Sequence, residues 1–157
     1  MHTLVSMATF RHTTLRIATE RPTEFIDLTA QLEALVAEAG IYAGLVNIQS
    51  QHTTTGIVVN EHEPLLLSDF AALLARTAPH DGDYRHDDMS SRTVNVAPDE
   101  RSNGHSHCRA LLLGATACLN VADTRLQLGR WQRVFLVELD GPRTREISVL
   151  VVGECAR

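Results

Sequence analysis

Residues 45–61 read LVNIQSQHTTTGIVVNE, and the interpretation of the whole chain starts from this stretch. Side chains alternate before the threonine run, so one face of an extended strand carries Val46, Ile48, Ser50 and His52. The run Thr53–Gly56 then requires a turn or a bulge. His52 therefore stands at the end of an apolar face, where the amides and hydroxyl groups of a turn can hold an anion or a polar ligand. The alternative is a hydrogen-bonded core histidine beside a threonine-rich strand.

Four further histidines lie in the second half of the chain, at His80, His86, His105 and His107. The first two belong to a polar stretch from Pro79 to Asn103, and the last two open directly onto an apolar run. His86 and His107 have acidic or amide neighbours, which can orient an imidazole as the outer partners of metal ligands do. The spacing matches neither a zinc finger nor a His-Glu-x-x-His helix, so a metal site would have to be assembled from separate segments.

The overall composition indicates one globular domain. The chain has 157 residues, 44% of them hydrophobic, which suffices for a single domain spanning residues 1–157. Its net charge of −5 and the lack of a basic run argue against nucleic-acid binding. No apolar stretch approaches the roughly 18 residues of a membrane span, and the N-terminus lacks the layout of a signal peptide. We therefore expect a cytoplasmic protein without a membrane or nucleic-acid partner.

All 14 basic side chains are arginine, and the chain has no lysine. Schiff-base chemistry, a P-loop with its phosphate-binding lysine and a kinase with its strand lysine are therefore excluded. Anion binding must depend on arginine, backbone amides or a metal ion.

The cysteine content indicates reduced thiols. Cys108, Cys118 and Cys155 are odd in number, widely spaced and set among apolar residues. This pattern favours buried free thiols over disulfides or a thiolate metal site.

The order of periodic segments predicts a strand, a helix, strands, a second helix, a long loop, a short helix and then strands to the end. The expected helices run from an N-cap at Thr23 to Gly40, from Pro64 to the residue before Pro79, and from about Ser106 to Gly114. The expected strands include 8–19, 45–52, 115–121, 126–127, 134–139 and 147–152. His107 would then lie at a helix N-terminus, which suits an anion or a metal.

The carboxylate of Glu138 lies in a run that is apolar on both faces, so it is expected to be partly buried and to need a partner. The following segment, Asp140-Gly-Pro-Arg-Thr-Arg145, supplies two arginines. One interpretation is a turn with a structural Glu–Arg pair. The other is that Arg143 or Arg145 presents its guanidinium to a phosphate or carboxylate ligand.

Four segments together resemble the YjbQ-like family. They are His52 to Glu61, Tyr84-Arg-His86-Asp, Asn103-Gly-x-Ser-His107 with Ala110 and Leu113-Gly114 after it, and Leu128 to Arg145. The resemblance covers nearly the whole chain in order. It implies an α+β domain in which a large, mostly antiparallel sheet packs with two main helices and one short helix. It also implies a homotrimer and a histidine-lined metal or anion site.

The activity that the resemblance implies is a weak secondary thiamine-phosphate synthesis, in which a hydroxymethylpyrimidine diphosphate condenses with a thiazole phosphate. Under this hypothesis the catalytic residues are Glu61 and His107. A divalent ion, Zn²⁺ or Mg²⁺, is expected on His52, His86 and His107. The expected ligands of the substrate phosphate are Thr53, Thr54, Asn103, Gly104, Arg143 and Arg145.

Two hypotheses from different classes remain open. The first is a metal-assisted transferase, in which the ion and arginines stabilise a departing diphosphate. The second is a binding protein for a small phosphorylated metabolite, without enzymatic activity or with a different one. The sequence departs from the family pattern at His62-Glu63-Pro64, where glutamate replaces an expected aspartate, so a ligand role for Glu63 is doubtful.

Overall fold

A computed structural model describes residues 8–155 of the chain. The prediction made for the N-terminus falls partly on residues 1–7, which lie outside the described part. In chain order the elements are β1 (Thr9–Ala18), β2 (Glu24–Asp27), α1 (Thr29–Ala39), β3 (Ile41–Ser50), β4 (Thr55–Glu61), α2 (Pro64–Thr77), the 3₁₀ turn η1 (Arg85–Asp87), α3 (Gly104–Leu113), β5 (Thr116–Ala122), β6 (Arg125–Leu126), β7 (Gln132–Glu138) and β8 (Thr144–Cys155). None of the helices in this described part is long and apolar enough to cross a membrane.

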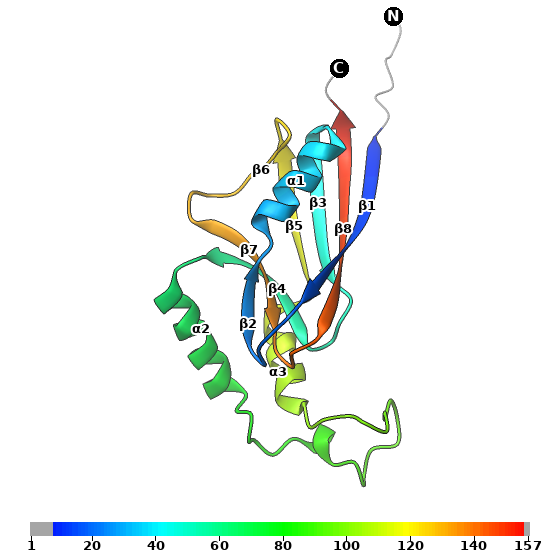
Figure 1. Ribbon diagram of the computed structural model, residues 1–157, viewed down its shortest axis with the longest axis vertical. Helices are drawn as coiled ribbons and strands as arrows, with labels where there is room; N and C mark the ends of the chain where they lie inside the picture. Colours follow the sequence, from blue (N-terminus) through cyan, green and yellow to red (C-terminus); the bar gives the residue numbers. More distant parts are fainter. Residues whose placement is uncertain (1–7, 156–157) are drawn as a thin grey trace, which may run out of the picture.

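The predicted α+β class is confirmed, and the antiparallel strands divide between two hydrogen-bonded sheets (Figure 1). The five-stranded sheet has the order β1-β8-β3-β5-β6, and the three-stranded sheet has the order β2-β7-β4. One core lies between the large sheet, the small sheet and α1, with Leu32, Val46 and Leu136 among its fully buried members. A second, smaller core lies between the other face of β7 and the helices α2 and α3.

Strand β7 is buried on both faces, which explains its continuous apolar sequence. Val134 and Leu136 belong to the first core, whereas Phe135 and Val137 belong to the second. Successive side chains of a strand point to opposite faces, so a strand between two cores is apolar at every position. Glu138 at its end is fully buried as well.

The first predicted helix begins later than expected. Glu24–Asp27 form strand β2, which pairs with β7, and α1 starts only at Thr29. The Asp27 carboxylate accepts a hydrogen bond from the Thr29 amide at 2.9 Å, and the Thr29 hydroxyl accepts one from the Val134 amide. Pairing with a neighbouring strand therefore outweighed the helical spacing of Phe25 and Leu28. The expected end is confirmed, because Gly40 adopts the left-handed conformation at φ 64°.

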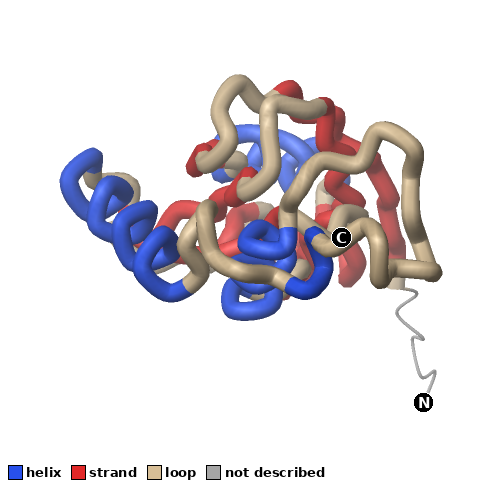
Figure 2. The backbone as a smooth tube through the Cα atoms, turned by 90° about the horizontal axis from the view of Figure 1, so that it is seen from below, coloured by secondary structure: helices blue, strands red, loops and turns tan. Residues whose placement is uncertain are grey.

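The other two helices follow their capping signals. α2 starts at Pro64 as predicted, and the Glu63 carboxylate caps it by accepting from the amides of Leu65 and Leu66. Of its residues only Leu74 is buried, and the helix lies at the periphery of the molecule (Figure 2). α3 starts at Gly104, about half a turn before the predicted Ser106.

The expected burial of the cysteines is wrong, although all three thiols are free. Cys108, Cys118 and Cys155 are exposed in a single copy of the chain. Cys118 lies on β5 with exposed neighbours two positions away on either side, whereas the alternate positions turn towards the core. The apolar surroundings in sequence therefore lie on the opposite face of the strand.

Candidate functional site

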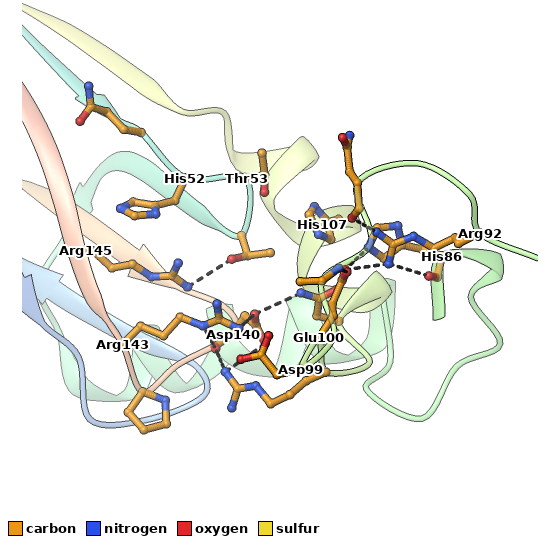
Figure 3. A pocket seen from close by; sticks show the side chains of 17 residues that line it. His52, Thr53, His86, Arg92, Asp99, Glu100, His107, Asp140, Arg143 and Arg145 are labelled. Atoms are coloured by element: carbon orange, nitrogen blue, oxygen red, sulfur yellow. Dashed lines mark hydrogen bonds and ion pairs between the residues drawn. The ribbon is translucent and has the colours of Figure 1, made fainter. Parts of the chain in front are cut away.

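A solvent-open cavity of about 900 Å³ lies at the end of the molecule where β3, β8 and α3 meet the long loop 78–103 (Figure 3). Four segments that are distant in sequence line it: the turn after β3, the long loop, α3, and the turn between β7 and β8. The lining residues are Gln51, His52, Thr53, Thr54, His86, Arg92, Asn95, Ala97, Asp99, Glu100, Arg101, Asn103, His107, Asp140, Pro142, Arg143 and Arg145. The three histidines expected to converge therefore face one cavity.

A buried ion pair forms one wall of this cavity. The Arg145 guanidinium donates from Nε to the Glu138 carboxylate at 2.6 Å, and from a terminal nitrogen to the Thr54 hydroxyl at 3.1 Å. The Thr19 hydroxyl also donates to Glu138. Burial raises the pKa of Glu138, but the hydrogen bonds from Arg145, from the Asp140 amide and from Thr19 outweigh it and hold the pKa below its ordinary value. The structural Glu–Arg pair is thus confirmed for Arg145.

Arg143 has a different environment from Arg145. Its side chain is 42% exposed, and it donates to the Asp140 carboxylate at 2.7 Å. The same carboxylate accepts from the Asn103 side chain at 3.2 Å and lies 3.7 Å from the Arg101 guanidinium. Asp140, itself only 8% exposed, therefore holds two partly exposed arginines at the cavity wall.

One ring nitrogen of His52 is hydrogen-bonded to the backbone of β8. Its Nε2 atom accepts a hydrogen bond from the Glu146 amide at 2.8 Å, so in the neutral ring the proton resides on Nδ1. Burial, followed by the positive charge of Arg145, lowers the pKa of His52. The ring is therefore neutral at pH 7. In this arrangement the remaining nitrogen can donate a hydrogen bond to a ligand, but neither nitrogen has a free lone pair for a metal ion.

His86 and His107 form a pair on the opposite side of the cavity. Their ring centroids lie 4.6 Å apart in an edge-to-face arrangement. The Nε2 atom of His86 is buried without a hydrogen-bond partner among the described residues, and it lies 3.5 Å from a Glu100 oxygen. Arg92 donates to the same Glu100 carboxylate at 2.7 Å. Burial and the neighbouring His86 lower the pKa of His107, which leaves a neutral imidazole at the cavity.

The first two amides at the start of α3 are already bonded within the chain. The Asp87 carboxylate accepts from the amides of Asn103 and Gly104, each at 2.9 Å. The His107 amide bonds to the Asn103 carbonyl, so His107 lies within the first turn rather than at its opening. A Cβ atom on Gly104 would lie 2.5 Å from the Cβ of Tyr84, so this glycine serves packing. A carboxylate of the chain therefore occupies the amides of Asn103 and Gly104, whereas the Asn103 side chain lines the cavity, so its phosphate-binding role stays a prediction.

The structure does not bring Glu61 to the cavity. β4 begins with Thr55 beside the turn at His52 and carries Glu61 to its far end, opposite Gln132 of β7. Six residues of strand span about 20 Å. Glu61 and His107 therefore do not meet within one chain, and a catalytic role for Glu61 stays a prediction.

Sequence reasoning missed Arg92, Glu100, Arg101 and Asp140. Three of them lie in the long loop, whose charged residues carry no periodic signal. In the sequence, Asp140 indicates only a turn before Gly141 and Pro142. Its place two residues after Glu138, in the segment that also supplies Arg143 and Arg145, is the one signal that could have identified it.

Comparisons with known proteins match nearly the whole chain. A family model described as UPF0047 protein YjbQ-like matches residues 13–154. A UPF0047 protein of Methanothermobacter thermautotrophicus is 38% identical over 140 residues, 89% of this chain and 90% of that protein. The UPF0047 protein YugU of Bacillus subtilis is 34% identical over 141 residues, 89% of this chain and 98% of its relative.

Solved structures agree with these sequence relatives. A YbjQ-like protein of unknown function from Sulfolobus solfataricus P2 has a TM-score of 0.85 at 33% identity, covering 94% of this chain and 100% of that one. A hypothetical protein from Aeropyrum pernix K1 has a TM-score of 0.81 at 30% identity, covering 92% and 99%. The chain belongs to the UPF0047 YjbQ-like family, as its sequence motifs predict.

The two arginines of the β7–β8 turn are expected to differ in their effect on stability. Arg145→Leu should lower the free energy of unfolding by about 3–5 kcal/mol, because it leaves the Glu138 carboxylate as an unpaired buried charge. Arg143→Leu should cost less than about 1 kcal/mol, because the Arg143 guanidinium is partly exposed and Asp140 keeps Asn103 and Arg101 as partners. Chemical denaturation of both variants measures the difference. Equal losses would show that Glu138 does not depend on Arg145.

Proposed function

We propose that the cavity binds a small phosphorylated metabolite. The carrying observation is the Arg143 guanidinium, which Asp140 holds at the cavity wall while a large part of the side chain stays open to solvent. Guanidinium groups bind phosphate through paired charge-assisted hydrogen bonds. Arg101 lies on the same carboxylate, and across the turn His52 offers an N–H and Thr53 a hydroxyl. Since the chain has no lysine, any cationic side chain that binds phosphate here must be an arginine or a histidine.

We further propose that the bound metabolite is a substrate for a transferase reaction of the kind that the family resemblance implies. The carbon–oxygen bond between a pyrimidine-methyl group and a diphosphate would break, and the nitrogen of a thiazole phosphate would form the new bond. Arg143 and the His52 N–H would donate hydrogen bonds to the departing diphosphate, whose oxygen gains charge in the transition state. The thiazole nitrogen attacks through its own lone pair, so no proton has to be removed, and the neutral His107 imidazole would keep its lone pair for the divalent ion.

A divalent ion is part of this proposal, and the donor groups support a smaller set than the expected three histidines. His86 fits, because its Nε2 is buried without a partner in the described part of the chain, and His107 lies beside it. His52 does not fit, because its Nε2 accepts from the Glu146 amide. Within residues 8–155 no group of three histidine, cysteine or acidic side chains is arranged around one point. His86 and His107 would therefore hold the ion together with ligand oxygens.

Imidazole donors favour Zn²⁺ over Mg²⁺. When bound, such an ion would neutralise charge on the phosphate oxygens.

The alternative of a binding protein is favoured by one observation. The acids Glu100 and Asp140 at the cavity are each already paired with an arginine, and Glu61 lies elsewhere. Asp99 also lines the cavity, and since His107 would be a ligand of the proposed ion, Asp99 is the acidic group left for acid–base catalysis. A ligand could therefore be held without being converted.

The phosphate proposal predicts a specific loss of anion affinity. Arg143→Ala should weaken binding of inorganic diphosphate about tenfold, the value of one lost charge-assisted hydrogen bond. Arg11→Ala on β1 is the matched control, because it removes the same charge at an exposed site away from the cavity. Isothermal titration measures both. The cavity is not the phosphate site if diphosphate does not bind the native protein. The same holds if it binds the native protein, Arg143→Ala and Arg11→Ala with equal affinity.

The transferase proposal predicts that His107→Ala abolishes thiamine-phosphate formation from the two substrates. His62→Ala is the control, because His62 pairs with Asp27 rather than lining the cavity. Product is measured at equal folded fractions. Diphosphate binding without any turnover by the native protein would refute the transferase and leave the binding protein.

We also propose that the protein is a homotrimer, as the family resemblance implies. The outer face of the large sheet supports association, because its central rows contain Phe10, Leu45 and Val152 beside uncharged polar residues. Phe10 and Leu45 are 72% and 42% exposed, and the helices of the described residues pack on the other side of this sheet or beyond it. Exposed apolar faces of this kind mark interaction surfaces.

Light scattering should give three times the mass of one chain. Leu45→Arg should dissociate the assembly, because it places a charge in the middle of the outer face. Leu65→Arg, at a 75% exposed position of α2, should not. A monomer at micromolar concentration would overturn the proposal.

A further inference from the structure

A second pair of histidines lies outside the cavity. His105 is on α3, and His80 is in the loop that follows α2. Their ring centroids are 4.5 Å apart with the planes tilted by 52°. His105 is only 5% exposed, whereas His80 is exposed to solvent. Neither residue lines the cavity described above, and the proposed function uses neither.

The hydrogen bonds around His105 fix the position of its proton. The Ser106 hydroxyl donates to the Leu139 carbonyl at 2.5 Å. A hydroxyl has one hydrogen, so in its contact with His105 Nε2 at 3.0 Å the Ser106 oxygen must accept. Nε2 therefore carries the proton, and Nδ1 is left as an unprotonated nitrogen with a free lone pair.

The Nδ1 atom of His105 is buried and has no hydrogen-bond partner in the region from residue 8 to residue 155. Leaving a polar atom in this state costs about 1–3 kcal/mol, so such atoms are rare in native proteins. A ligand that takes the lone pair would remove this cost. The nearest aromatic neighbours are the rings of His80 and Tyr84, the latter with its centroid 6.4 Å from that of His105.

The arrangement has the outer partner that metal-binding histidines require. A ligating imidazole donates its second ring N–H to a fixed acceptor, which orients the ring. Here Ser106 and the Leu139 carbonyl provide that acceptor chain. Two imidazoles on one tetrahedral ion, with metal–nitrogen bonds of about 2.1 Å, have ring centroids about 5 Å apart. The observed 4.5 Å is close to this value, and a small shift of the exposed His80 would close the difference.

We propose that His105 and His80 form a binding site for a borderline transition-metal cation such as Zn²⁺, completed by water on the exposed side of His80. The buried guanidinium of Arg109 opposes a cation here, although its Nε is bonded to the Ala78 carbonyl. Asp87 and Asp140 act on His105 in the opposite direction. With two protein ligands and this balance of charge, we expect affinity in the micromolar range and a preference for imidazole-binding cations over Mg²⁺ or Ca²⁺.

The consequence of such a site would be mechanical. The ion would tie the start of the long loop to α3. The same loop carries His86, Arg92 and Glu100 to the cavity wall. The inference does not depend on what the cavity binds.

The test is a Zn²⁺ titration of metal-free full-length protein by calorimetry. His80→Ala removes an exposed ligand and should weaken one binding event at least about tenfold, as the loss of a ligand does. His12→Ala removes an exposed imidazole on β1 and should not change that event. His86→Ala should also leave it intact, which separates this site from the ion proposed for the cavity.

A second measurement reports on His105 without altering the fold. The nitrogen chemical shifts of its ring should show a proton on Nε2 alone at pH 7.5, and added Zn²⁺ should shift Nδ1 in the native protein but not in His80→Ala. Native-like Zn²⁺ binding by His80→Ala would overturn the proposal. A proton on Nδ1 in the metal-free protein would do the same.

Discussion

The buried ion pair between Glu138 and Arg145 is a charged link between the two sheets, whose shared core is otherwise mainly apolar. Glu138 ends β7 of the small sheet, and Arg145 lies near the start of β8 of the large sheet. Thr19 connects the pair to the end of β1, and Thr54 connects it to the turn after β3. A fully buried carboxylate is tolerated only with such partners. The position of His52, Arg143 and Asp140 relative to one another follows from this junction.

Much of the fold was predictable because local signals and tertiary packing agree. Pro64 with Glu63 before it, and Gly40 after an apolar stripe, fix helix ends through backbone chemistry that needs no distant partner. The alternation through Val46 and Ile48 similarly defines the inward face of β3. Phe25 shows the limit of such signals. Its spacing along the chain suits a helix, but pairing with β7 places it in a strand. The strand that pairs with β2 is distant in sequence, so the residues of β2 alone do not reveal it.

The sequence predicts which segments form the site better than it predicts which of their atoms can bind a ligand. The segments at His52, His86, His107 and Arg143 do meet at one cavity, as their motifs suggest. Which atoms remain available to a ligand depends on neighbours from other segments. The Glu146 amide donates to the Nε2 atom of His52, and the Glu138 carboxylate accepts from the Arg145 guanidinium. The Asp87 carboxylate accepts from the first amide of α3. None of these pairings follows from spacing along the chain.

The carboxylate of Asp87 also determines how stiff the cavity wall is along its length. The 3₁₀ turn that contains it is fastened to the first amides of α3, so this part of the loop cannot leave without exposing the helix end. Farther along, around Asn95, the contact to the Arg92 guanidinium lies within the loop itself. The wall is thus anchored firmly beside His86 and more loosely at its tip. The carboxylate of one short turn therefore divides the loop into a part held by the helix and a part held only by its own side chains.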